Sequence, residues 1–176
     1  MRTAEWLVKE LDRPVSKPEH SADEFPLGES NQESIRVFRL ANAATTKDLQ
    51  QIAVGMRSLG DVRRVFTYNG RSIIVIRGTA DQLALSQWLF DQLDQPAATT
   101  QSKQEYQVPG SNDDLVGVFY LRNSDSPGRL QDTLAQVRNA AAIRRICALD
   151  SVHAIALRGA ASQIVQADAL ISAQKQ

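Results

Sequence analysis

The stretch IRVFRLAN, residues 35–42, opens a structural unit that the chain contains twice. The same pattern returns as VGVFYLRN, residues 116–123, and a register of 81 residues then joins the two copies without a gap to the end of the chain. A fixed internal period is the signature of repeated supersecondary units. The 176 residues therefore contain two copies of one module.

A third trace of the repeat lies at the front of the chain. The sequence EWLVKELDRP, residues 5–14, is similar to QWLFDQLDQP, residues 87–96, which closes the first copy. Residues 1–14 are therefore expected to form a helix that is the remnant of a preceding repeat, in a chain that is a fragment or has an altered start site. The alternative is a free N-terminal helix whose last residues match by coincidence.

Each copy has the pattern of a strand, a helix, two strands and a second helix. Residues 35–40 are a short β-branched and aromatic run, which is typical of a strand. Thr45 suits the N-cap of the first helix, and apolar residues such as Leu49 and Ile52 then keep the spacing of one helical face until Gly60.

The middle of each copy predicts a β-hairpin. In the first copy, residues 62–67 and 72–77 flank the pair Asn-Gly at 69–70, which tolerates the positive φ of a tight turn. In the second copy, Asp-Ser at 150–151 takes that place. A capping box then begins the last helix of the first copy, with its two side chains at Thr79 and Gln82.

These elements define an α+β fold of tandem βαββα modules with KH-like topology, preceded by an extra N-terminal helix. Residues 73–76 are apolar on both faces, so we place this strand at the centre of a three-stranded sheet with both helices on one face. The expected parts are the helix at 1–14, an acidic linker at 15–34, the first module at 35–96, a linker at 97–115 and the second module at 116–176. Each linker carries a short similar piece, EFPL at 24–27 and EYQV at 105–108, that is a candidate for an added edge strand.

The face of the first sheet that the helices leave open is predicted to carry an apolar patch. Side chains alternate between faces along a strand, which places Ile35, Val37, Ile73 and Val75 together on that open face. One interpretation is a surface for a partner protein. The other is that a linker or a neighbouring unit of the same chain covers the patch.

The charges of the chain cancel between its parts. Lys and Arg number 20, as do Asp and Glu, yet residues 35–95 and 116–176 each carry a net charge of +3, residues 1–34 carry −4 and residues 96–115 carry −2. The overall basic excess that is typical of nucleic-acid-binding or membrane-surface proteins is therefore missing. The acidic segments can instead dock on basic modules, within one chain or between chains.

Several kinds of chemistry are excluded or disfavoured by the sequence. No stretch approaches the roughly 18 apolar residues of a membrane-spanning helix, and the first residues lack the apolar core of a signal peptide. A single cysteine allows no internal disulfide and no thiolate-rich metal site. The acidic pair Asp113-Asp114 has no second cluster to complete a metal site, so no metal and no cofactor are expected.

Cys147 and His153 are the candidates for a catalytic Cys/His pair. A two-residue turn between them would set Ala148 opposite His153 and Cys147 opposite Ala154, so that the two side chains point to opposite faces of the sheet. Cys147 also matches Phe66 of the first copy, which we interpret as a core position. We therefore expect a buried structural thiol, no small-molecule substrate and no enzyme activity.

An arginine doublet recurs at the same position of both copies, as Arg63-Arg64 and as Arg144-Arg145. If the strand that it begins lies at a sheet edge, the charges protect that edge against aggregation. A second interpretation is that these arginines pair with acidic residues of an adjacent unit or partner. Phosphate binding is a third.

The modules resemble the short repeated N-terminal (NolW-like) periplasmic domains of secretins, the ring-forming outer-membrane channels of bacterial secretion and pilus systems. The resemblance rests on residues 37–42, 73–82 and 89–96 and extends over nearly all of each copy. It implies a non-catalytic module that contacts copies of itself or other envelope proteins, in the periplasm or at the outer membrane, and that meets a membrane only through a larger assembly. Two departures are Ala160-Ala161-Ser162 in place of the Thr-Ala-Asp of the first copy, and the absence of a long β-rich segment for a channel.

The alternative is a nucleic-acid-binding protein with paired KH-like modules. The GxxG loop with which KH modules clamp a nucleic-acid backbone is missing from both copies. Exposed aromatic side chains for base stacking are also expected to be scarce. For these reasons we do not expect nucleic acid as the partner.

Overall fold

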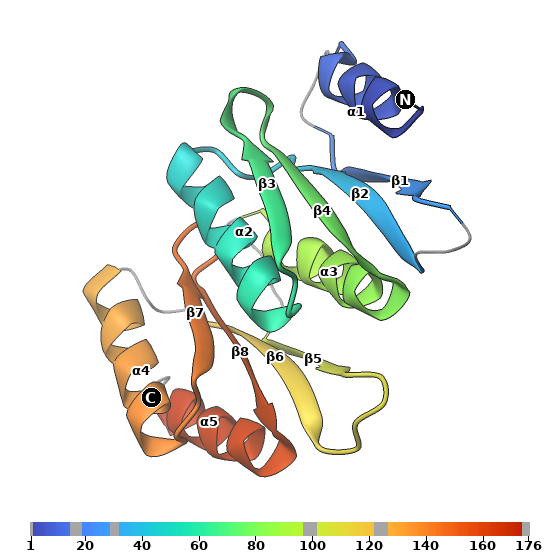
Figure 1. Ribbon diagram of the computed structural model, residues 1–176. Helices are drawn as coiled ribbons and strands as arrows, with labels where there is room; N and C mark the ends of the chain where they lie inside the picture. Colours follow the sequence, from blue (N-terminus) through green and yellow to red (C-terminus); the bar gives the residue numbers. More distant parts are fainter. Residues whose placement is uncertain (1, 15–18, 29–31, 97–101, 122–126, 174–176) are drawn as a thin grey trace. The chain divides into compact units, whose positions relative to one another are not determined.

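The computed structural model of the chain describes residues 2–14, 19–28, 32–96, 102–121 and 127–173. The chain divides into two compact units, Met1–Phe90 and Asp91–Gln176. The first unit is built from α1 (Arg2–Asp12), β1 (Ser21–Pro26), β2 (Glu33–Arg39), α2 (Thr46–Leu59), β3 (Arg64–Tyr68), β4 (Ile73–Thr79) and α3 (Ala80–Leu93), whose last residues pass the unit boundary (Figure 1). The second contains β5 (Lys103–Gln107), β6 (Asp114–Tyr120), α4 (Pro127–Ala140), β7 (Arg145–Leu149), β8 (Ala154–Ala160) and α5 (Ala161–Ala173).

The expected α+β fold of two βαββα modules is confirmed. Each sheet is antiparallel, with the strand order β1-β2-β4-β3 in the first unit and β5-β6-β8-β7 in the second (Figure 1). Of the three strands expected in each module, the third is central, since β4 lies between β2 and β3. Thr45 caps α2 through a capping box with Asp48, and α2 ends at Gly60, as predicted.

The expectation of three strands in each sheet is wrong, because the two candidate edge strands both form. β1 and β5 come from the segments expected to be linkers, and each adds a fourth strand. Charge explains why the acidic β1 joins the sheet. Arg36 and Arg39 of β2 form ion pairs with Glu24 and Asp23 of β1, respectively.

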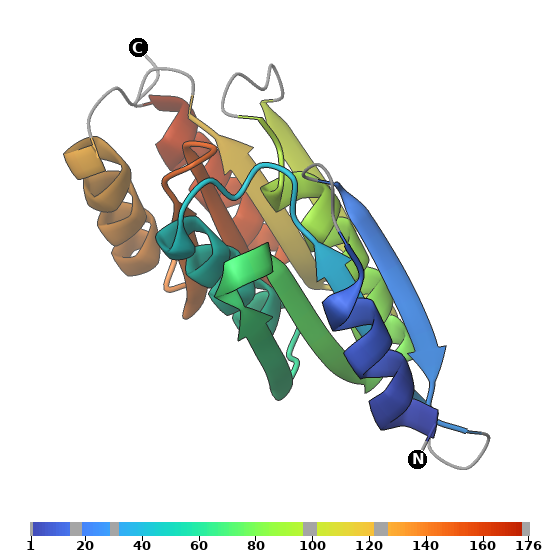
Figure 2. The ribbon, with the colours of Figure 1, turned by 90° about the horizontal axis from the view of Figure 1, so that it is seen from above.

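The two faces of the first sheet are covered by different helices. Ile74 and Ile76 are fully buried. On the opposite face, α1 packs through Trp6, Leu7 and Leu11 on a cluster made by the four residues of the predicted open-face patch: Ile35, Val37, Ile73 and Val75. Figure 2 shows α1 in front of the sheet and α3 behind it.

Both hairpin turns differ in detail from the expected two-residue connections. Asn69 and Gly70 lie in a short 3-10 turn, Asn69–Arg71, and the positive φ falls on Ser72, at 50°. In the second unit it falls on His153, at 47°. A longer connection shifts the register, so that Cys147 pairs with Ala156 instead of Ala154, and Ala148 pairs with Ile155 instead of His153.

Candidate interaction site: an arginine pocket at the sheet edge

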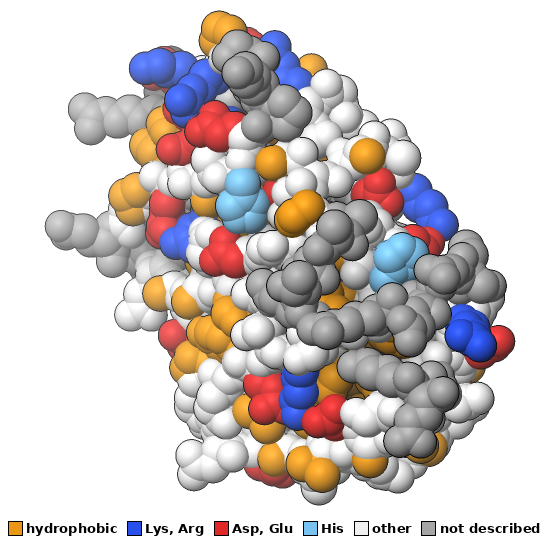
Figure 3. All heavy atoms as spheres, turned by 180° about the vertical axis from the view of Figure 1, so that it is seen from behind, with side chains coloured by type: hydrophobic (Ala, Val, Ile, Leu, Met, Phe, Trp, Pro, Cys, Tyr) orange, Lys and Arg blue, Asp and Glu red, His pale blue; other side chains and the backbone are white. Residues whose placement is uncertain are grey.

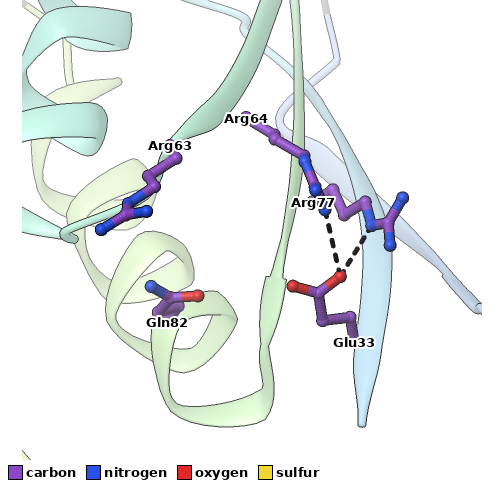
Figure 4. Close-up of a pocket in the computed structure, with 5 residues that line it drawn as sticks. All are labelled: Glu33, Arg63, Arg64, Arg77 and Gln82. Carbon is purple, nitrogen blue, oxygen red and sulfur yellow. Dashed lines mark hydrogen bonds and ion pairs between the residues drawn. The ribbon is translucent and has the colours of Figure 1, made fainter. Parts of the chain in front are cut away.

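A pocket of about 230 Å³ lies where three strands of the first sheet meet the beginning of α3. Its lining consists of Glu33, Arg63, Arg64, Arg77 and Gln82 (Figure 4). β2 supplies Glu33, β4 supplies Arg77, and the edge strand β3 begins at Arg64. The sheet register places Arg64 directly opposite Arg77, so two like charges would repel each other there without an anion between them.

Glu33 is that anion. Its Oε2 accepts a hydrogen bond from Arg77 Nε at 2.8 Å and another from Arg64 NH1 at 3.3 Å. One carboxylate therefore bridges two guanidinium groups, and the pocket retains a net positive charge from its three arginines and single acid. Figure 4 shows Glu33, Arg64 and Arg77 on one side of the pocket, and Arg63 and Gln82 on the other.

Gln82 is held rigidly in the wall of the pocket. Its Oε1 accepts from the Thr79 N–H at 3.0 Å, while Thr79 Oγ1 accepts from the Gln82 N–H at 3.4 Å, which confirms the predicted capping box. Its Nε2 donates to the carbonyl of Asp61 at 2.7 Å. Gly78 makes this fold-back possible, because a Cβ at that position would stand 2.9 Å from Gln82 Oε1.

The second unit repeats the residues of this pocket at a spacing of 81: Asp114, Arg144, Arg145, Arg158 and Gln163. Both oxygens of Asp114 accept from Arg158 Nε at 3.0 Å, and Oδ2 also accepts from Arg158 NH2 at 2.5 Å. Gln163 again folds back, since it accepts from the Ala160 N–H at 2.9 Å and donates to the Ala141 carbonyl at 3.0 Å. The charged framework is thus built twice.

The structure separates the predicted interaction residues into two sets. Arg63 and Arg64 belong to the pocket of the first unit, and Arg144 and Arg145 occupy the matching positions of the second. The apolar set, Ile35, Val37, Ile73 and Val75, lies beneath α1, in keeping with the interpretation that a neighbouring part of the chain covers it. Its use as a surface for a partner protein stays a prediction.

Sequence reasoning missed Glu33, Arg77 and Gln82 as members of the site. The signal was available, since all three have a counterpart of the same chemical type 81 residues later. Glu33 was placed in a linker because the first module was taken to begin at residue 35. Only the strand register shows that its carboxylate reaches Arg64 and Arg77.

The edge strand β3 also exposes aromatic side chains. Phe66 is 58% exposed and Tyr68 is 41% exposed, and both share a face with Arg64. The expectation that Phe66 is a core residue is therefore wrong. Phe66 pairs with Val75, so it points to the face that carries α1, at the outer strand of the sheet.

The described residues contain no arrangement that supports the Cys/His chemistry considered above. Cys147 lies in β7, whereas His153 lies in the turn before β8, with backbone register that does not pair them. Burial raises the pKa of the Cys147 thiol to about 12, which leaves it protonated at neutral pH. Within the same described ranges, no group of three or more His, Cys, Asp or Glu residues could hold a metal ion, and no helix has the length and apolar character to span a membrane.

Basic and acidic side chains lie beside one another at several places on the face seen in Figure 3. The ion pairs of the first unit follow this pattern, since acidic residues from β1 and α1 meet arginines of β2. The expected docking of acidic segments on a basic module therefore occurs within the chain.

No family model and no curated protein matches this sequence. Among solved structures, the chain is similar to the N-terminal domain of the secretin XcpQ from Pseudomonas aeruginosa, with 14% sequence identity, a TM-score of 0.31 and coverage of 89% of this chain and 71% of that chain. A dimeric mutant of that domain gives 13% identity, a TM-score of 0.33 and the same coverage. Aeromonas hydrophila ExeD gives 12% identity and a TM-score of 0.30, over 81% of this chain and 28% of that chain. Likenesses this distant carry no argument about function.

Proposed function

We propose that this chain is a non-catalytic assembly module of a secretin-like component of the bacterial cell envelope, in a protein secretion or pilus system. Its two units are short NolW-like repeats that contact neighbouring copies or other envelope proteins. Its partners are protein chains, and it meets a membrane only through the larger assembly. Its location is the periplasm or the inner side of the outer membrane.

The observation that supports this proposal is the duplicated arginine pocket. Each copy sets three arginines around one carboxylate at the beginning of an edge strand. Exposed arginines of this kind recognise carboxylates through two parallel hydrogen bonds and fix the register of protein contacts. Neither pocket contains a nucleophile or a general base from the Cys and His residues of the chain, so a binding role fits better than a catalytic one.

The location can be tested in a bacterium that carries the natural gene. Spheroplasts would be fractionated, and the protein would be followed by an antibody together with a cytoplasmic and a periplasmic marker. The proposal predicts release with the periplasmic contents or recovery with outer membranes. Quantitative recovery with the cytoplasmic marker would contradict the envelope assignment.

A second candidate function is binding of single-stranded nucleic acid, in line with the KH-like topology. The exposed Phe66 and Tyr68 beside Arg64 favour it, because bases stack on aromatic side chains next to cationic groups. This surface was not expected from the sequence. Fluorescence anisotropy with labelled single-stranded DNA and RNA tests it, and binding that weakens in Phe66→Ser and falls steeply with salt would favour this candidate.

A further inference from the structure

The two arginine pockets differ by one carboxylate. In the second unit, Asp113 precedes Asp114, and its Oδ1 accepts a hydrogen bond from the Ala161 N–H at 3.0 Å. Ala161 begins α5, in the turn that also carries Gln163 of the pocket framework. The matching position of the first unit is Gln32, which brings no charge.

This difference changes the electrostatic balance of the two sites. The first pocket has three arginines and one carboxylate, whereas the corresponding residues of the second unit include three arginines and two carboxylates. The excess positive charge is therefore larger in the first pocket. An anion from outside gains more there, because part of the positive charge in the second unit is already balanced.

Arg63 is the group left to receive such an anion. Its side chain is exposed, and among the residues that the structure describes it makes no ion pair or side-chain hydrogen bond. Glu33 occupies Arg64 and Arg77 on the other side of the pocket (Figure 4). Gln82 holds the wall between them through its three hydrogen bonds, so the pocket is preorganised around an open guanidinium.

We infer that the pocket of the first unit receives an aspartate or glutamate carboxylate from a second protein chain, at Arg63, a charge that Asp113 supplies internally in the second unit. The inference rests on the proposed assembly function and names the chemistry of the partner. A carboxylate fits because the anions already present in both pockets are carboxylates. Its two oxygens match the planar fork of a guanidinium. Acidic segments of this type exist in the chain itself, since residues 1–34 hold 8 acidic and 4 basic residues.

The test is a titration of the full chain, labelled at its arginines, observed through the side-chain Nε–H signals. The probe is a pentapeptide of glutamate with blocked ends, and sodium phosphate at equal ionic strength is the comparison. The signal of Arg63 is expected to shift and saturate with the peptide, whereas that of Arg144 stays in place. Arg63→Gln removes the response, and Arg144→Gln, its matched control, leaves it unchanged.

A second variant tests the internal role of Asp113. Asp113→Asn keeps an oxygen for the Ala161 N–H but removes the charge, so Arg144 is now expected to respond to the peptide. The inference is overturned if Arg63 does not shift, if phosphate shifts it at lower concentration than the peptide, or if Arg144 stays silent in Asp113→Asn. A cytoplasmic location with a positive titration would reject the envelope function and leave this carboxylate site standing.

Discussion

Arg39 of β2 holds Glu10 of α1 by two hydrogen bonds. One goes from Arg39 NH2 to the Glu10 carboxylate at 2.6 Å, and the other goes to the Glu10 carbonyl at 3.1 Å. The Arg39 side chain is 3% exposed and also forms an ion pair with Asp23 of β1. In the second unit, Tyr120 occupies the repeat position of Arg39, and its hydroxyl donates to the carbonyl of Gln92 at 2.8 Å. The same tie is thus made with different chemistry.

Replacing Arg39 with Ala is expected to destabilise the chain by about 2 kcal/mol or more, because Glu10 and Asp23 lose a charged donor. Urea unfolding, followed by circular dichroism, measures the loss as a lower midpoint. Arg13→Gln is the control, since its pair with Asp23 is exposed and 3.7 Å long. An unchanged midpoint in Arg39→Ala would show that α1 is not fastened through this residue.

Replacing Trp6 with Ala is expected to loosen α1 from the sheet, at a cost of about 2 kcal/mol, because Trp6 packs on the apolar cluster beneath α1. It also stacks on Phe25, with ring centroids 5.1 Å apart. Binding of an apolar dye should rise, and the amides of α1 should exchange faster. Val8→Ala, at a position 58% exposed on the same helix, should change neither measurement.

The ion pair between Glu24 and Arg36 should contribute stability only while Glu24 is ionised. The hydrogen bond from Arg36 lowers the pKa of Glu24 below its ordinary 4.5. The folded chain therefore binds this proton less readily than the unfolded chain, so the contribution is present above that ordinary value and is lost as the pH falls through the lowered pKa. The stability difference between the natural chain and Glu24→Gln should shrink on acidification from pH 6, and a difference that grows would contradict this account.

The thiol of Cys147 should be inert in the folded chain. Burial raises its pKa to about 12, so the thiolate that reacts with alkylating reagents is scarce at pH 8. Iodoacetamide labelling, measured by mass spectrometry, is expected to be slow without denaturant and fast in concentrated urea. Labelling at equal rates in both conditions would show that Cys147 is an accessible, activated thiol.

Much of the fold could be predicted because each copy repeats a periodic pattern that both copies satisfy. The edge strands were less certain, since β1 and β5 look like linkers in composition. β1 is held partly by ion pairs with Arg36 and Arg39, and such pairs depend on which strands lie side by side. Phe66 was misplaced for a related reason, because a shift of one residue in a strand moves a side chain to the other face.

The candidate site was predictable only as far as the repeated arginine doublets. Arg63 and Arg64 could be found in the sequence, and their counterparts at an 81-residue spacing supported a shared role. The bridge from Glu33 to Arg77 could not be found, because it joins residues 44 positions apart through the pairing of β2 with β4. The repeat of the chain identifies candidate residues, and the sheet register decides which of them meet.

The most direct test of the central claim is the self-association of the purified chain, measured by light scattering over a range of concentrations and at low and high salt. The account predicts association that weakens at high salt, where screening shortens the reach of the charges. It also predicts that replacing Arg63, Arg64, Arg144 and Arg145 with Gln abolishes association. The charge-matched control replaces Lys9, Lys47, Arg129 and Arg138 with Gln, and it should associate like the natural chain. A strict monomer at high concentration, or association that the first variant leaves unchanged at both salt levels, would contradict self-assembly through the arginine pockets.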